Sequence, residues 1–174
     1  VMNALGEIAS SEAEDALLAQ EGKFPAEDTE VWYFALSRCG SAKSLPVLTK
    51  AAREANYSLD RKSGNEAYIF LLNKLAEGGE KKITNKAASD LYKNALKENQ
   101  VATRIAALQI LLKTDDKNRA KLIVKALNDP EREYRNAALL YAEEYKDADL
   151  SRAIAGKLKK ADAETQMDII NWLG

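Results

Sequence analysis

Apolar positions in this 174-residue chain recur with a long period, and this repeat constrains the fold more than any other feature of the sequence. Equivalent leucines in similar segments are separated by 31, 36, 36 and 32 residues: Leu5, Leu36, Leu72, Leu108 and Leu140. Within the segments apolar residues recur every three or four positions, which is the spacing of an amphipathic helix. Because such a period accommodates two short helices, the sequence predicts a row of helical hairpins.

Strand patterns are almost absent, since no run of residues alternates β-branched and polar side chains between turns. Short breaks at Gly, Ser, Asp or Asp-Pro separate the helical stretches instead. We expect helices near 1–9, 11–20, 27–39, 42–55, 64–77, 80–97, 100–113, 116–128, 130–145, 148–160 and 163–173. The corresponding repeats lie near 1–22, 23–57, 58–97, 98–128 and 129–161, with a partial repeat at 162–174.

The segment Leu122–Pro130, followed by Tyr134–Leu140, resembles the HEAT repeat family, most closely the short variant first noted in bilin-lyase proteins. Asp-Pro, then Arg, then Ala-Ala are the elements of that pattern found here. The similarity is strongest at 101–140 and 4–19 and weakest at 57–97, where the Ala-Ala pair is missing. The resemblance implies an all-α, right-handed α-solenoid of about five HEAT-like hairpins, whose second helices line a concave surface.

Both ends of the sequence look like interior parts of such an array. The chain opens within a first helix, and 163–173 is an apolar first helix with no second helix to cover it. Repeat arrays normally carry polar terminal caps, because each repeat buries its apolar face on a neighbour. We therefore expect a fragment of a longer protein.

The residue types that most enzymes need are missing. There is no His, which excludes Ser-His-Asp and Cys-His nucleophiles and His metal ligands. Cys39 is the single Cys, so the chain has no internal disulfide or CxxC metal site, and without a base Cys39 is expected to be a small buried residue. Two pairs of adjacent acidic residues have structural explanations. In Asp115-Asp116, Asp116 is expected to be a helix N-cap, and Glu143-Glu144 is expected to lie on a solvated helix face.

Structural roles are also expected for two other groups of residues. Asp129 and Arg135 flank the helix predicted at 130–145, where the resemblance implies a pair that ties adjacent loops. The aromatic residues of two first helices are expected in the core: Trp32, Tyr33, Phe34, Tyr68 and Phe70. We predict neither an enzyme nor any catalytic, cofactor-binding or metal-binding residue.

Charge is nearly balanced over the whole chain, with 26 basic and 27 acidic residues, but the two sets of predicted helices differ in sign. The second helices at 42–55, 80–97, 116–128 and 148–160 contain 16 basic and 5 acidic residues, whereas the first helices from 27 onward contain 6 and 11. Helical spacing places lysines in two columns, the first made of Lys82, Lys86, Lys93 and Lys97 and the second of Lys117, Lys121 and Lys125. Any solvated amphipathic helix shows such a row, and the difference in sign is what favours a binding role.

These observations predict a non-enzymatic module that binds a protein partner, with the lysines attracting an acidic segment. One alternative is an accessory segment of a larger multidomain protein or enzyme. The second alternative is that the concave surface with these lysines forms a basic groove that binds a nucleic acid. No apolar stretch approaches the roughly 18 residues of a membrane span, so no membrane partner is expected. The sequence leaves the cellular compartment and the oligomeric state open.

Overall fold

The computed structural model describes residues 10–23, 25, 28–59 and 64–174. The predicted helix at 1–9, with Leu5, lies outside these residues. In the part of the chain that is described, the fold is all-helical and has no β-strand, as the sequence predicts. None of its helices is both long enough and apolar enough to cross a membrane.

The observed helix bounds match the predicted ones at 64–77 and 163–173 and differ by up to five residues at the ends of the other described helices. The α-helices are α2 (Ser11–Leu18), α3 (Thr29–Cys39), α4 (Leu45–Glu54), α5 (Gly64–Glu77), α6 (Lys81–Lys97), α7 (Val101–Thr114), α8 (Arg119–Ala126), α9 (Arg132–Ala142), α10 (Ala148–Ala155) and α11 (Ala163–Leu173). Short 3-10 helices precede α4 and follow α9 and α10: η2 (Ala42–Ser44), η3 (Glu143–Tyr145) and η4 (Leu158–Lys160).

Polar residues before the helices fix where several of them begin. The Ser10 hydroxyl accepts a hydrogen bond from the Ala13 N–H at 3.2 Å and caps α2. Asp147 and Asp162 cap α10 and α11 in the same way, by accepting from the N–H of the third residue beyond. Each cap satisfies a backbone donor that has no partner within its helix.

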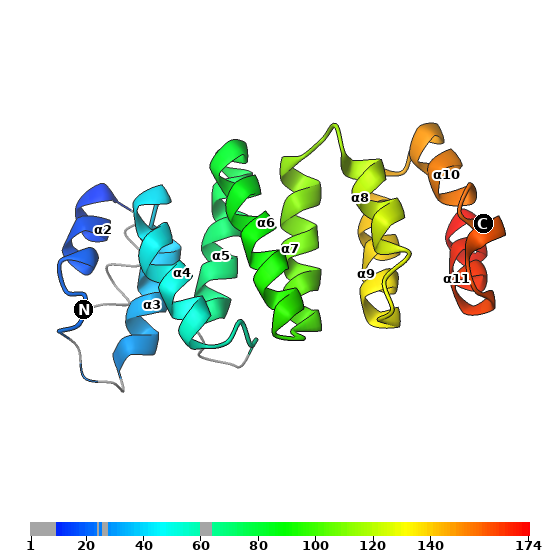
Figure 1. The fold of residues 1–174 in the computed structure, drawn as a ribbon. Helices are drawn as coiled ribbons and strands as arrows, with labels where there is room; N and C mark the ends of the chain where they lie inside the picture. The colour runs from blue at the N-terminus through cyan, green and yellow to red at the C-terminus, as the bar shows by residue number, and fades with distance from the viewer. Residues whose placement is uncertain (1–9, 24, 26–27, 60–63) are drawn as a thin grey trace.

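The helices follow one another in a row from one end of the molecule to the other (Figure 1). Helices α3, α5, α7, α9 and α11 form one layer, in which each contacts the next. Helices α4, α6 and α8 pack against the first layer, mainly on α5, α7 and α9 respectively, and the contact between α6 and α7 is the most extensive in the molecule. Helix α6 makes no comparable contact with α4 or α8, whereas α8 packs on α10, so the second layer is open on both sides of α6.

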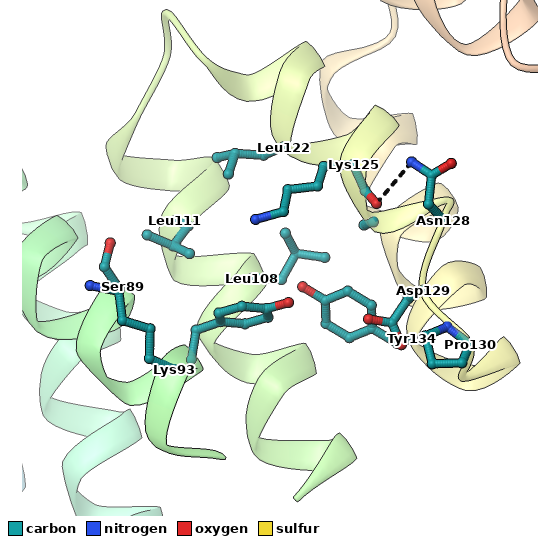
Figure 2. Close-up of a pocket in the computed structure, with 12 residues that line it drawn as sticks. Ser89, Lys93, Leu108, Leu111, Leu122, Lys125, Asn128, Asp129, Pro130 and Tyr134 are labelled. Carbon is teal, nitrogen blue, oxygen red and sulfur yellow. Dashed lines mark hydrogen bonds between the residues drawn. The ribbon is translucent and has the colours of Figure 1, made fainter. Parts of the chain in front are cut away.

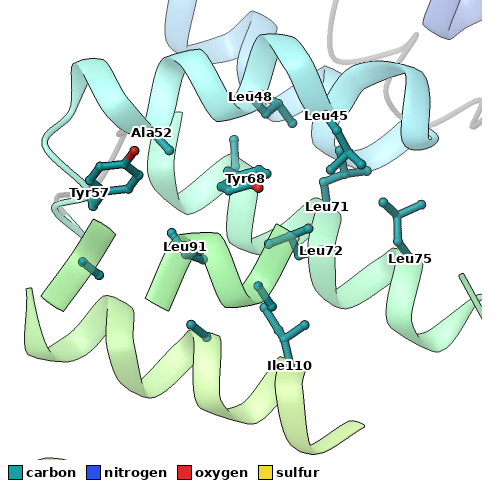
Figure 3. Close-up of a cluster of buried hydrophobic side chains, with 14 of the residues drawn as sticks. Leu45, Leu48, Ala52, Tyr57, Tyr68, Leu71, Leu72, Leu75, Leu91 and Ile110 are labelled. Carbon is teal, nitrogen blue, oxygen red and sulfur yellow. The ribbon is translucent and has the colours of Figure 1, made fainter. Parts of the chain in front are cut away.

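The largest apolar cluster joins α4, α5, α6 and α7 (Figure 3). Leu71 and Leu72 of α5 are fully buried there, with Leu91 of α6 and Ile110 of α7 beside them. Complete burial of one such side chain stabilises the fold by about 1.5–3 kcal/mol. A second cluster joins α7 to α11, and a third joins α2 and α3 around Trp32. Each cluster draws on consecutive helices, so the core is a continuous strip.

The prediction that the aromatic residues of α3 and α5 are buried was correct for two of the five. Trp32 and Tyr68 are buried, and Tyr33 is half-buried. Phe34 and Phe70 are 40% and 45% exposed, and their rings pack on each other with centroids 6.2 Å apart. Phe34 is two residues from Trp32, a rotation of about 200° around the helix, so the two side chains point in opposite directions.

Candidate functional site

The four lysines of the first predicted column lie along one side of α6, and all of them are exposed. Lys93 is 3.5 Å from Asp90, its neighbour on the same helix. Lys82, Lys86 and Lys97 form no ion pair with any residue that the structure describes. An ion pair between exposed side chains contributes about 1 kcal/mol or less, so the Lys93 ammonium also remains available to a ligand.

The second predicted column is only partly helical. Lys121 and Lys125 lie on α8 and are exposed, whereas Lys117 lies in the turn before α8, because the helix begins at Arg119 and not at 116. Lys117 is therefore near the other two lysines in sequence but does not continue their helical column. None of the three has an ion-pair partner within the described ranges.

Asp116 was expected to cap α8, and that prediction is wrong. The residue at the N-cap is Asn118, and its side chain makes no capping hydrogen bond. The Asp116 carboxylate instead accepts hydrogen bonds from Lys81 at 2.7 Å and Arg119 at 2.6 Å. The hydrogen bond from Lys81 holds the pKa of Asp116 below its ordinary value. This carboxylate connects the start of α6 with the start of α8, and it pairs with none of the lysines of the two columns.

Two grooves flank α6, one on each side of its lysines. The α4/α6 groove has a volume of about 530 Å³, and its lining includes Leu45, Tyr68 and Ile83. The α6/α8 groove has a volume of about 440 Å³, and its lining includes Leu108 and Leu122. They exist because α6 is separated from α4 and from α8 while the helices of the first layer contact one another, so side chains of the first layer form their floors.

The α6/α8 groove combines an apolar floor with cations at its rim (Figure 2). Leu108 and Leu111 of α7 form the floor, and Leu122 of α8 lies on one wall. Lys125 extends from α8 over this floor, and Lys93 lies on the opposite side, on α6. The groove therefore offers apolar contact at its centre and positive charge on both walls.

The acidic residue in this groove, Asp129, is neutralised by a buried partner. Its carboxylate pairs with the Arg104 guanidinium, whose side chain is 4% exposed. That guanidinium also lies over the ring of Tyr134, 4.4 Å from its centroid. Burial raises the pKa of Tyr134, and neighbouring Tyr92 raises it further, so Tyr134 keeps its proton at neutral pH. The net charge that the groove presents is that of its lysines.

Asp129 and Arg135 have the structural roles that were predicted, but not as a side-chain pair. Arg135 donates hydrogen bonds to the backbone oxygens of Asp129 and Pro130, both at 2.9 Å, and to the Glu164 carboxylate at 2.6 Å. Asp129 pairs with Arg104, 25 residues earlier in the chain. The two residues thus connect three successive first helices, α7, α9 and α11.

Cys39 does not have the environment of a reactive thiol. The residue is buried at the end of α3, and this burial raises the pKa of the thiol despite the nearby Lys74. A protonated thiol is a poor nucleophile. Among the residues that the structure describes, no three acidic or Cys side chains are grouped as metal ligands.

The grooves themselves were not predicted from the sequence. One signal was present: Ser89 and Ala126, small residues on α6 and α8, both line the α6/α8 groove. Small side chains at these places leave space over α7, but periodicity alone does not distinguish them from small residues in close helix contacts.

No protein-family model matches the chain, and no curated protein or solved structure shows significant similarity to it.

Proposed function

We propose that the chain is a HEAT-like, right-handed solenoid of about five hairpins and acts as a non-enzymatic module for binding a protein partner. The sequential contacts within the first layer and the pairing of each second helix with the first layer support this architecture. A curved array of this kind binds through an extended surface and needs no reactive side chain. The layer that contains α4, α6 and α8 is the proposed binding face.

The partner's contact region is an acidic peptide segment. The observation that carries this proposal is a set of exposed lysines beside apolar grooves, without an ion pair among the described residues: Lys82, Lys86 and Lys97 on α6, and Lys121 and Lys125 on α8. Positive charge at a rim attracts a negatively charged segment and fixes its position, while apolar contact supplies affinity. Lysine suits this role because its ammonium group is a mobile point charge that tolerates varied carboxylate positions.

Fluorescence anisotropy with a labelled, Glu-rich peptide of about 15 residues tests the proposal, with a Lys-rich peptide of the same pattern as the comparison. We expect the Glu-rich peptide to bind, and its affinity to fall as salt rises above about 0.1 M. The variant K82E/K86E/K97E should lose at least tenfold in affinity. The control K23E/K159E/K160E reverses three exposed lysines elsewhere on the molecule and should bind like the wild type.

Two results would overturn the proposal. One is equal binding of the Glu-rich and Lys-rich peptides, and the other is equal weakening by the α6 variant and the control. A duplex DNA probe at about 50 mM salt addresses the nucleic-acid alternative. DNA binding that is tighter than peptide binding, with a steep dependence on salt, would replace a protein partner with a nucleic acid.

A further inference from the structure

We infer that the α6/α8 groove binds one large apolar side chain, aromatic or leucine, of the partner's acidic segment, and that Lys93 and Lys125 pair with carboxylates on either side of it. This inference rests on the proposed function and specifies which part of the surface selects the partner. Its basis is the coincidence of an apolar floor, two cations on facing walls and a volume suited to a side chain.

The groove has the chemistry of an anchor site. Its volume of about 440 Å³ lies within the range of about 300–1,000 Å³ that is typical of small-molecule pockets, so it has room for one large apolar side chain and the backbone next to it. Leu108, Leu111 and Leu122 offer apolar contact, and an apolar side chain that leaves water to contact them gains free energy in proportion to the area buried. Anchors of this kind, placed in a central pocket, dominate the affinity of most protein interfaces.

The α6 wall and the floor of the groove are held in place before any ligand binds. Arg104 lies against the rings of both Tyr92 and Tyr134, 5.6 Å and 4.4 Å from their centroids, and its charge is matched by Asp129. The two tyrosine rings are 6.0 Å apart. These contacts join α6, α7 and α9 at one end of the groove, so binding an anchor costs little rearrangement.

The surroundings favour a peptide over a small anionic molecule. Basic residues continue beyond the groove in both directions, with Lys82, Lys86 and Lys97 on α6 and Lys121 on α8. A small molecule seated in the groove would contact only the residues that line it. A peptide segment that places one side chain in the groove reaches the other lysines with its flanking carboxylates.

The α6/α8 groove suits an acidic segment better than the α4/α6 groove does. In the α4/α6 groove the carboxylate is that of Asp90, which is exposed and has only the exposed Lys93 as its partner, at 3.5 Å, and Lys50 lies 4.0 Å from Glu21. In the α6/α8 groove the carboxylate is that of Asp129, whose side chain is only 11% exposed and is paired with Arg104. An incoming carboxylate therefore meets less repulsion at the α6/α8 groove.

Filling the groove tests the inference. Ser89 is half-buried and lines the groove from α6, so Ser89→Phe places a ring in the space that the anchor would occupy. Ala102→Phe is the matched control, because Ala102 is exposed on α7 and lines neither groove. The probes are two Glu-rich peptides that differ only in a central Phe or Ala, together with 3-phenylpropionate as a small aryl carboxylate.

The wild type and Ala102→Phe should bind the Phe peptide at least tenfold more tightly than the Ala peptide. Ser89→Phe should remove that difference and leave the weaker, charge-dependent binding in place. Lys93→Gln/Lys125→Gln should weaken the Phe peptide severalfold more than the single variant Lys121→Gln does. Circular dichroism and urea unfolding of each variant establish that it is folded.

The results separate this inference from the proposed function. Equal binding of the two peptides, or an unchanged preference in Ser89→Phe, overturns the anchor while K82E/K86E/K97E still tests the charged surface. Binding of 3-phenylpropionate as tight as that of the Phe peptide would make the groove a small-molecule site and would also overturn the inference. Failure of both peptides to bind overturns the anchor and the proposed function together.

Discussion

The Arg104 guanidinium forms a buried ion pair with the Asp129 carboxylate and so ties α7 to the turn that precedes α9. The two side chains are 4% and 11% exposed. Burial opposes the charge of Arg104, but the hydrogen bonds with Asp129 and Tyr92 outweigh that effect and raise its pKa. Arg104 therefore stays charged in the folded protein, and the Asp129 carboxylate is the partner that compensates its charge.

Removing one member of this pair should strongly destabilise the fold. Arg104→Met leaves the Asp129 carboxylate buried without its cation, and the expected loss in the free energy of unfolding is about 3–5 kcal/mol. Urea unfolding followed by circular dichroism measures it. Replacing both residues, as Arg104→Met/Asp129→Asn, should recover part of the loss, because no uncompensated charge remains buried.

The exposed pair Arg152–Asp149 provides the comparison. Arg152 Nη1 and Asp149 Oδ1 are 2.9 Å apart, but the two side chains are 76% and 86% exposed. Arg152→Met should change the free energy of unfolding by less than about 1 kcal/mol, since water screens an exposed pair. Similar costs for Arg104→Met and Arg152→Met would contradict the importance of the buried pair.

A close approach between α4 and α5 yields the second prediction. A Cβ atom added at Gly64 would overlap the methyl group of Ala51. An alanine within a helix normally favours folding over glycine by about 0.5–1 kcal/mol. At this position the overlap should reverse the sign, and Gly64→Ala should lower the free energy of unfolding by about 1–3 kcal/mol, measured in urea.

Two further variants locate the cause in that contact. Ala51→Gly added to Gly64→Ala removes the obstructing methyl group and should restore part of the stability. At Gly78 the nearest atom to an added Cβ would be the Lys74 backbone oxygen at 3.4 Å, so Gly78→Ala should be nearly neutral. If Gly64→Ala were stabilising, the two helices would not be in the close contact that the structure shows.

The local structure was predictable because it depends on short-range patterns. The helices at 64–77 and 163–173 have the predicted bounds, since apolar spacing and the residues at the ends act within a few positions. The same spacing placed Lys82, Lys86, Lys93 and Lys97 correctly on one exposed side of α6. Lys117 was misplaced because the turn after α7 extends to Asn118, a matter of where one helix begins.

Relations across the helices were not predictable in the same way. The pairing of Asp116 with Lys81 joins residues 35 positions apart, and helical periodicity says nothing about such a contact. The α6/α8 groove depends on how far apart two helices of one layer are held by the helix beneath them. The side chains of α7 that lie between those two helices, such as Leu108 and Leu111, appear in the sequence only as ordinary helix residues.

The buried carboxylate of Glu14 yields the third prediction, a pH-dependent stability at the junction of α2 and α4. Burial favours the neutral acid, but Glu14 Oε1 accepts hydrogen bonds from the Ser41 N–H and the Ser44 hydroxyl, each at 2.7 Å, and the net effect lowers the pKa of Glu14.

A carboxylate with a lowered pKa stabilises the folded state above its unfolded pKa of about 4.3, and this contribution is lost as pH falls through the folded pKa. Glu14→Gln should therefore cost about 1–3 kcal/mol at pH 7 and progressively less below about pH 4, as measured by urea unfolding across this range. Glu133→Gln is the control: this change at an exposed position on α9 should lower the free energy of unfolding by less than about 0.5 kcal/mol. If the cost of Glu14→Gln did not vary with pH, the charge of Glu14 would not be what stabilises this junction.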